Sequence, residues 1–212
     1  MLTHRLIPWL TAAALCFAAV ATPAQAQAQA GKTPDALIKD VSTDVLDAVR
    51  ADKSIKQGDV QKVMTLVDSK VMPYVDFQRM TASAVGRYWR QATPEQQKRL
   101  QEEFKTLLVR TYSGALAQVR DQTVELKPMR SAPDAKDVVV KTEIRGSGDP
   151  VQLDYRLELT AAGWKIYDMS VLGVWLVENY RNSFAQEISA SGIDGLINKL
   201  AERNKTAGAT KG

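Results

Sequence analysis

Asp168 is the residue whose surroundings in the sequence are best suited to acid–base chemistry. The chain around it is apolar and aromatic, with Trp164, Ile166, Tyr167 and Met169. Burial there would disfavour the charged carboxylate and raise its pKa, as a general acid or base requires, and Tyr155 or Tyr167 would complete an acid–base pair. The simpler interpretation, which we favour, is a carboxylate that is hydrogen-bonded near the end of a strand.

Asp154 and Glu158 are a second pair of carboxylates, spaced so that they share one face of a strand. Arg156 lies between them on that face. Alternating charges of this kind are typical of a solvent-exposed ladder rather than of a catalytic pair. We therefore expect this face of the strand to be wet.

Gly31-Lys32-Thr33 imitates the end of a phosphate-binding loop. The first glycine of that motif would stand at position 26, where the chain has Ala26, and no strand is predicted before it. Nucleotide binding is therefore not expected.

Residues 1–26 are predicted to be a secretory signal peptide. They contain a continuous apolar stretch over residues 6–20, followed by small residues at Ala24 and Ala26 for the peptidase. The single histidine and the single cysteine, His4 and Cys16, would be removed with this segment. The exported chain would then have no cysteine or histidine. Disulfides, thiolate or imidazole metal ligands, cysteine nucleophiles and Ser-His-Asp triads are therefore excluded. We predict no metal and no other cofactor. Carboxylate acid–base chemistry stays open as the alternative to the favoured prediction of no catalytic residue and no enzymatic activity.

The predicted compartment is the bacterial periplasm, because an exported chain without cysteine is unlike the disulfide-rich domains of eukaryotic secretion. No segment after the leader reaches the ~20 apolar residues of a membrane-spanning helix. The formal net charge of +4 is a mild basic excess, which suits anionic lipid headgroups or an acidic protein face. Nucleic acid is not an expected partner in that compartment.

The first half of the exported chain is predicted to be helical. Residues with helix-capping chemistry precede apolar residues at helical spacing. The expected starts are Thr33-Pro34, Asp59, Asp76 and the capping box from Thr93 to Gln96. The last of these helices is the longest, and it keeps its period to about Arg120.

The second half changes to an alternation of apolar and polar residues, which predicts strands. In the clearest case, residues 151–159, Leu153, Tyr155 and Leu157 face one way and charged residues face the other. Short turn-like connections predict a four-stranded antiparallel meander with one apolar face. Its strands are expected at residues 123–129, 137–145, 151–159 and 164–171.

Together these elements predict one α+β domain over residues 27–203, in which helices wrap a twisted antiparallel sheet. The apolar run VLGVWLV at residues 171–177 joins the last strand to a helix, where the apolar face of the sheet meets the helical half. Such layers can enclose an apolar cavity. Residues 204–212 are small and polar, and we expect them to form a disordered tail.

A distinctive set of segments follows in order along most of the exported chain. They are MPYVDF at 72–77, GRYWRQATPEQ at 86–96, EEFKTLLVRTY at 102–112, VQLDYRL at 151–157, GWKIYDMSVLGVWLVENYRNSF at 163–184 and GIDGLINKL at 192–200. On these segments the chain resembles the MlaC family of periplasmic phospholipid-binding proteins, also called the toluene-tolerance auxiliary family. Many members have Gly-Val-Ser where this chain has Gly173-Val174-Trp175. The larger side chain would narrow a pocket mouth or change a partner surface.

The resemblance implies a soluble periplasmic carrier that holds a phospholipid by its acyl chains. Such a carrier passes lipid between an outer-membrane lipoprotein-porin complex and an inner-membrane ABC transporter that bears an MCE-domain protein, and so maintains outer-membrane lipid asymmetry. The family fold is a twisted sheet wrapped by helices, similar to the cone-shaped nuclear-transport-factor-like folds. We expect the carrier to be a monomer.

On this implication, the apolar face of the sheet, the segment after its last strand and the longest helix are expected to line an acyl-chain pocket. The predicted lipid-binding residues are Phe104, Leu108, Tyr112, Leu153, Tyr155, Leu157, Val171, Val174 and Trp175. Two alternatives stay open. One is a small acid–base enzyme on the same kind of fold, and the other is a periplasmic chaperone that binds extended peptides in an apolar groove.

Overall fold

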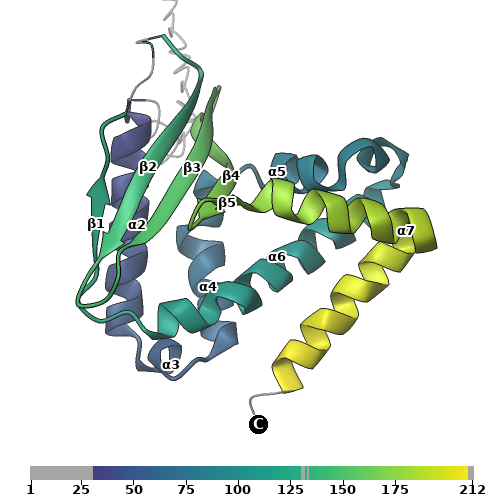
Figure 1. The fold of residues 1–212 in the computed structure, drawn as a ribbon, viewed down its shortest axis with the longest axis horizontal. Coiled ribbons are helices and arrows are strands. Elements are labelled where there is room, and N and C mark those ends of the chain that lie inside the picture. The colour runs from purple at the N-terminus through teal and green to yellow at the C-terminus, as the bar shows by residue number, and fades with distance from the viewer. Residues whose placement is uncertain (1–30, 130–131, 133, 210–212) are drawn as a thin grey trace, which may run out of the picture.

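Helices wrap a twisted antiparallel sheet in the computed structural model, which describes residues 31–129, 132 and 134–209 (Figure 1). The helical elements are α2 (Pro34–Ala51), α3 (Lys53–Lys56), α4 (Val60–Lys70), η1 (Met72–Tyr74), α5 (Phe77–Val85), η2 (Gly86–Gln91), α6 (Pro94–Ala117) and α7 (Leu176–Ala209). The strands are β1 (Thr123–Leu126), β2 (Asp137–Arg145), β3 (Val151–Thr160), β4 (Gly163–Val171) and β5 (Val174–Trp175). The α+β class is confirmed, whereas the predicted signal peptide lies outside the described residues. The likeness to nuclear-transport-factor-like folds stays a prediction.

The predicted helix starts are confirmed, and at Asp59, Asp76 and Thr93 a side chain satisfies free backbone donors of the first turn. Thr33 makes no such bond, and its helix begins with Pro34 instead. Asp59 accepts hydrogen bonds from the N–H groups of Gln61 and Lys62, at 2.9 and 3.1 Å. Thr93 and Gln96 form the predicted capping box, with reciprocal side chain to backbone bonds of 3.0 and 3.2 Å. These helices therefore begin where their own local sequence directs.

The sheet of the described residues has five strands in the order β1-β2-β3-β4-β5, so the prediction of four strands is wrong. All neighbours are antiparallel. Positive φ angles at Leu172 (51°) and Gly173 (84°) turn the chain back on itself, and β5 then pairs with Val171 and Ser170 of β4. A strand of two residues shows no alternation, which is why the pattern of the sequence did not reveal it.

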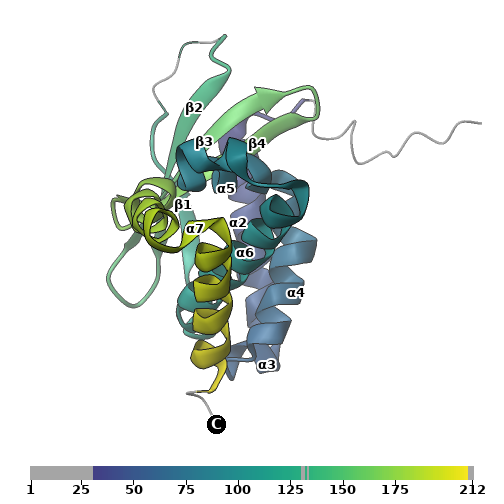
Figure 2. The same ribbon diagram turned by 90° about the vertical axis from the view of Figure 1, so that its right-hand side faces the viewer.

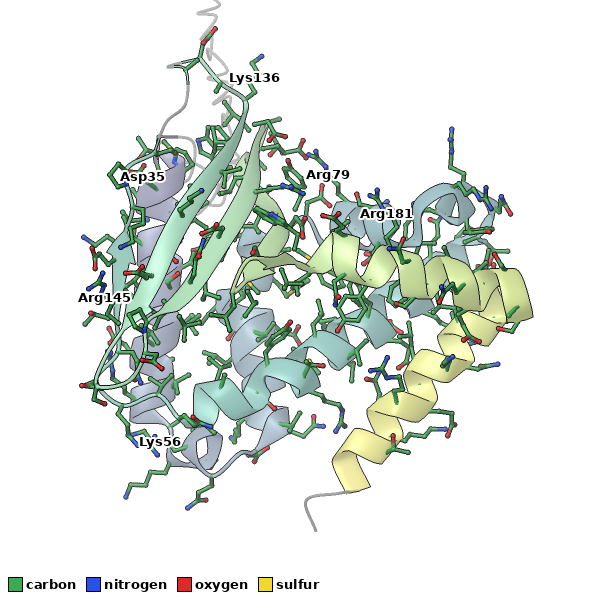
Figure 3. All side chains as sticks on the ribbon, in the orientation of Figure 1. Asp35, Lys56, Arg79, Lys136, Arg145 and Arg181 are labelled. Atoms are coloured by element: carbon green, nitrogen blue, oxygen red, sulfur yellow. The ribbon has the colours of Figure 1, made fainter. Side chains whose placement is uncertain are left out.

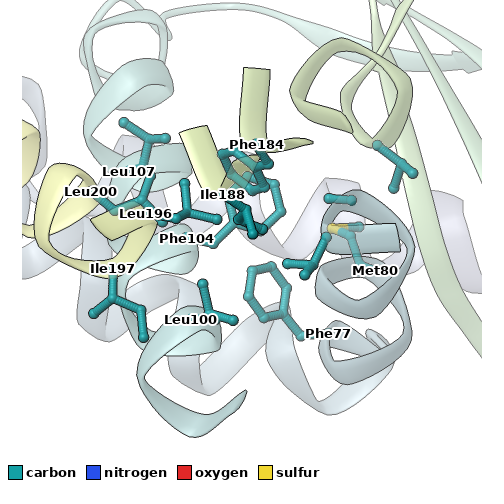
Figure 4. Packing of buried hydrophobic residues seen from close by; sticks show 13 residues of the cluster. Phe77, Met80, Leu100, Phe104, Leu107, Phe184, Ile188, Leu196, Ile197 and Leu200 are labelled. Carbon is teal, nitrogen blue, oxygen red and sulfur yellow. The ribbon is translucent and has the colours of Figure 1, made fainter. Parts of the chain in front are cut away.

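The buried core consists of separate hydrophobic clusters. One packs α5, α6 and α7 around Phe104 (Figure 4). The Phe104 ring centre lies 5.8, 5.0 and 5.2 Å from those of Phe77, Tyr180 and Phe184. A second packs α2 against the sheet, and a third packs α2, α3 and α4 against α6. Aromatic pairs at these spacings contribute beyond the area that they bury. The clusters surround a region between the sheet and the helices.

Helix α7 consists of two helical halves that meet at Gly192, whose φ of 74° and ψ of −178° are not helical. The first half runs away from the sheet, and the second half turns back from its far end (Figures 1 and 2). Leu196, Ile197 and Leu200 of the second half join the cluster around Phe104. Neither α7 nor another helix of the described residues is long and apolar enough to span a membrane.

The C-terminal end of α7 corrects the expected start of the tail. The helix continues to Ala209, so residues 204–209 are helical rather than disordered. Asn204 is buried and donates hydrogen bonds to the backbone carbonyl and the carboxylate of Glu103, at 2.9 and 2.7 Å. This contact joins residues that are distant in the chain, and the polar composition of the segment does not reveal it.

Replacing Gly192 tests the kink in α7. Gly192→Ala should lower the free energy of unfolding by about 1–3 kcal/mol, because its φ/ψ region is essentially restricted to glycine. Gly114→Ala in α6 is the matched control, and it should raise the free energy of unfolding by about 0.5–1 kcal/mol through helix propensity. An added Cβ meets no atom within 4 Å at either position, so urea unfolding compares backbone conformation alone. Stabilisation by both substitutions would contradict the kink.

Candidate functional site

An apolar cavity of about 600 Å³ lies between the sheet and helices α2, α4 and α6. This volume is within the range of about 300–1,000 Å³ that is usual for small-molecule sites. The cavity reaches the surface where exposed lining residues gather. These are Ala115 and Gln118 near the end of α6, and Gly148, Asp149 and Val151 beside the turn from β2 to β3.

The lining follows the periods of the elements that supply it. On α6 the lining positions recur every three or four residues, so one stripe of the helix faces the space. That stripe contains Lys105, Leu108, Val109, Tyr112, Ala115, Leu116 and Val119. On the strands, alternate residues face it, as Leu153 and Tyr155 do on β3 and Met169 and Val171 on β4.

The structure separates the nine residues predicted for lipid binding. Five of them line the cavity together, namely Leu108, Tyr112, Leu153, Tyr155 and Val171. The other four lie elsewhere. Phe104 is buried in the aromatic cluster and Leu157 between the sheet and α2, whereas Val174 is exposed and Trp175 contacts Arg156. A lipid contact for any of the nine stays a prediction.

Helices α2 and α4 supply a wall of the cavity that the sequence analysis did not assign. Their lining residues include Ile38, Val41, Val45, Val63, Leu66 and Val67. The apolar stripes of these helices were visible in the sequence as core faces. Periodicity shows that a face is turned inward, but it does not distinguish a packed interior from an open one.

The cavity lining carries little charge. Lys105 lines it, but its ammonium group is paired with Asp68 at 2.7 Å. Burial raises the pKa of the Tyr155 hydroxyl, and hydrogen bonds to Ser42 and Thr142 partly oppose that rise. Burial also raises the pKa of Tyr112. Both hydroxyls are therefore neutral at physiological pH, and the wall is suited to an apolar ligand rather than to an ion.

Asp168 is hydrogen-bonded near the end of β4, as the favoured interpretation predicts. Its carboxylate is 1% exposed and accepts hydrogen bonds from the N–H groups of Met169 and Val177, at 2.9 and 3.1 Å. Arg156 donates a further bond at 3.1 Å. Burial raises the pKa of Asp168, and these three contacts oppose the rise. The carboxylate thus binds the first turn of α7, and it does not belong to the cavity lining.

The expected charge ladder on β3 is only partly wet. Asp154 is 6% exposed, so its predicted exposure is wrong. On the neighbouring strand β4, Asp154 pairs with Ser170. Ser170 pairs in turn with Trp175 of the unpredicted strand β5. The added strand extends the sheet beside Asp154 and brings a large side chain to that face. Glu158, further along β3, is paired with Arg79 of α5.

A family comparison agrees with this architecture. The model of the MlaC protein family matches residues 39–202 of the chain, which include the whole sheet and most of the helices. The chain belongs to the MlaC family. The resemblance drawn from the sequence segments is therefore confirmed.

Individual relatives span nearly the same length. The toluene tolerance protein ttg2D of Pseudomonas putida is 27% identical over 84% of this chain and 86% of its own. The intermembrane phospholipid transport system binding protein MlaC of Haemophilus influenzae is 23% identical over 80% of this chain and 81% of its own. A solved structure of the phospholipid-binding protein from Ralstonia solanacearum, in complex with a phospholipid, is 48% identical with a TM-score of 0.81, and the match covers 84% of this chain and 99% of that chain.

The raised pKa of Asp168 predicts a pH-dependent difference from Asp168→Asn. Because the folded state raises this pKa above its ordinary value of 3.8, folded protein binds the proton more tightly than unfolded chain does. Wild type should therefore gain stability relative to the variant as the pH falls through the range just above 3.8. Urea unfolding of both proteins between about pH 7 and about pH 4 measures the difference. A relative loss for wild type on acidification would contradict the assigned direction.

Proposed function

We propose that this protein is a periplasmic carrier that holds a phospholipid by its acyl chains in the cavity between the sheet and helices α2, α4 and α6. The observation that carries the proposal is the cavity itself, an apolar space of about 600 Å³ with an opening to the surface. The Ralstonia relative, similar to this chain over most of its length, was solved with a phospholipid, which supports the same class of ligand here.

The physical need for such a carrier follows from the hydrophobic effect. Each methylene group exposed to water costs about 0.8 kcal/mol, so two chains of ~15 methylenes cost on the order of 20 kcal/mol or more. Free diffusion of a phospholipid through water is therefore negligible. A cavity with apolar walls replaces the bilayer for the chains. Because the ligand is held without a covalent bond, it can leave when a better apolar environment is presented.

The polar headgroup would stay at the mouth of the cavity. Gln118, Gln122 and Asp149 are the polar lining residues at that end, and they are exposed or half-buried. A charged headgroup is strongly hydrated and costs far more to bury than it returns, unless it is fully paired. With the headgroup at the mouth, the acyl chains lie in the apolar cavity. The headgroup stays in water beside side chains that can hydrogen-bond with it.

The carrier would act as a monomer between membrane complexes. The proposed partners are an outer-membrane lipoprotein-porin complex and an inner-membrane ABC transporter with an MCE-domain protein. The name of the Haemophilus relative, an intermembrane phospholipid transport system binding protein, supports this proposal. The chain has no energy-coupling motif in its sequence, so the direction of transfer would come from the partners.

The two alternatives lack a supporting contact. For an acid–base enzyme, Asp168 is held by the backbone of α7 and by Arg156, while Tyr167 donates its hydroxyl to Asp137 instead, at 2.9 Å. For a peptide-binding chaperone, the cavity offers few hydrogen-bonding groups in its wall, and an extended peptide has a polar group at every residue. Of the three functions, lipid carriage therefore agrees best with the site.

Native mass spectrometry of the protein purified from a bacterial periplasm without detergent tests the proposal directly. We expect a stoichiometric mass increase that solvent extraction identifies as phospholipid. Protein that carries no lipid, and that also takes none from phospholipid vesicles, would contradict the carrier function and favour the enzyme or the chaperone.

Leu153→Asp should abolish lipid retention, because the carboxylate would lie in the apolar wall. An unpaired charge in such a site costs several kcal/mol, which corresponds to a loss of affinity of about a hundredfold or more. Leu159→Asp is the matched control on the same strand, since Leu159 is 44% exposed and does not line the cavity. Lipid content by extraction, with circular dichroism as a check of folding, compares the two variants. Normal lipid content in folded Leu153→Asp would remove this residue from the site.

Ala115→Trp is an uncharged test of the same cavity. Ala115 lines the mouth and is exposed, so a larger side chain there occupies space without entering the packed core. We expect lower lipid content and unchanged thermal stability. An unchanged lipid content would mean that the ligand does not use this mouth.

A further inference from the structure

The turn between β4 and β5 contains a residue that suits its backbone poorly. Leu172 has a φ of 51° and Gly173 a φ of 84°, and the flanking residues Val171 and Val174 pair with each other. A two-residue hairpin turn with positive φ at both positions is of the primed type, which favours Asn, Asp or Gly. Leu172 is alone among the described non-glycine residues in having a positive φ.

Leu172 is mostly exposed, so little packing offsets this conformation. Its side chain is 65% exposed and that of Val174 is 52% exposed, higher fractions than those of the other exposed large apolar residues in the described chain. An added Cβ at Gly173, between them, would meet no atom within 4 Å. An apolar residue that is both conformationally unfavourable and exposed does not stabilise the fold. Departures of this kind from local preference are expected where function requires them.

The turn borders the mouth of the cavity. Val171, immediately before it, and Leu176, two residues after Val174, both line the cavity. The Leu172 N–H also donates to the carbonyl of Gln152 at 2.9 Å, next to Val151, another exposed lining residue. We call residues 172–174 the rim turn. The rim turn therefore lies between two lining residues in the chain and beside a third across the sheet.

The neighbours of the rim turn have the chemistry of a membrane interface. Trp175 follows it directly, and the guanidinium carbon of Arg156 lies 3.9 Å from the centre of the Trp175 ring. Indole rings concentrate at the level of lipid headgroups, and arginine side chains bind phosphate while their stems lie along apolar surface. The Arg156 guanidinium also binds Asp168, but its side chain is 37% exposed, so part of it is open to such a contact. Exposed apolar residues next to an aromatic and a cationic residue combine the groups that contact the acyl chains and the headgroups of a bilayer surface.

We propose that the rim turn inserts shallowly into a phospholipid bilayer, with Trp175 and Arg156 at the headgroups, so that the cavity mouth faces the lipid. The insertion rests on the proposed carrier function, because it would bring the cavity to its lipid. Direct contact with a bilayer goes beyond that function. A stable protein partner or a second copy of the chain would need about 800 Å² of complementary surface on each side, and two exposed side chains supply much less. A fluid bilayer needs no complementary shape, and weak insertion suits a carrier that must leave again.

Vesicle flotation with the full exported chain tests the proposal. The probe is vesicles of phosphatidylethanolamine and phosphatidylglycerol, and the key variant is Leu172→Asn, because asparagine tolerates positive φ. This variant should partition onto vesicles about tenfold more weakly than wild type, since it removes an inserted apolar side chain. Its melting temperature should equal or exceed that of wild type, so misfolding does not account for the loss. Val174→Thr, nearly equal in shape, should weaken partitioning in the same direction.

Leu159→Asn is the matched control, because Leu159 is exposed but lies outside the cavity lining. It should leave vesicle partitioning unchanged. Partitioning that is equal in wild type and Leu172→Asn, or equally weakened in the control, would overturn the proposal. Absence of wild-type partitioning, or dimerisation without vesicles that Leu172→Asn abolishes, would overturn it too. Lipid extraction from the same samples reports the carrier function separately, because cargo can be present or absent whether or not the rim turn binds vesicles.

Discussion

The cavity persists because the elements around it are held apart by packing that lies elsewhere. Protein interiors otherwise close to high density, and an apolar void forfeits the contacts of its lining. Here the aromatic cluster around Phe104 fixes α5, α6 and α7 against one another, while separate clusters fix α2 to the sheet and α4 to α6. Closing the space would require these clusters to move. The site is therefore the region that the packed clusters leave between them.

Polar contacts near the edge of the sheet add to this frame. Asp168 binds the first turn of α7. Arg79 of α5 lies near the edge of the sheet (Figure 3). Its guanidinium carbon is 3.7 Å from the centre of the Tyr167 ring, and its charge is paired with Glu158. Burial and the neighbouring Asp137 raise the pKa of Tyr167 to about 12, so its hydroxyl stays protonated and keeps its bond to Asp137. These contacts help to fix where α5 and α7 leave the sheet.

Local features of the sequence predicted most elements correctly. The helix starts at Asp59 and Thr93 depend on side chains within a few residues, and the inward faces of the strands depend on simple alternation. The missed features have two other causes, a turn whose residues do not suit its backbone and a contact between residues distant in the chain. Strand β5 exists because Leu172 and Gly173 adopt positive φ angles, and the helix after position 203 is held by the contact between Asn204 and Glu103.

The same distinction applies to the candidate site. Sequence periodicity was sufficient to identify apolar faces, because the direction of a side chain follows from the geometry of its own helix or strand. It did not separate Leu153, which borders the cavity, from Leu157 on the same face of β3, which is fully buried against α2. These two leucines differ in the partners that other elements bring to them. Whether an inward residue fills a core or faces an open space is therefore decided by packing between distant segments, which no local pattern records.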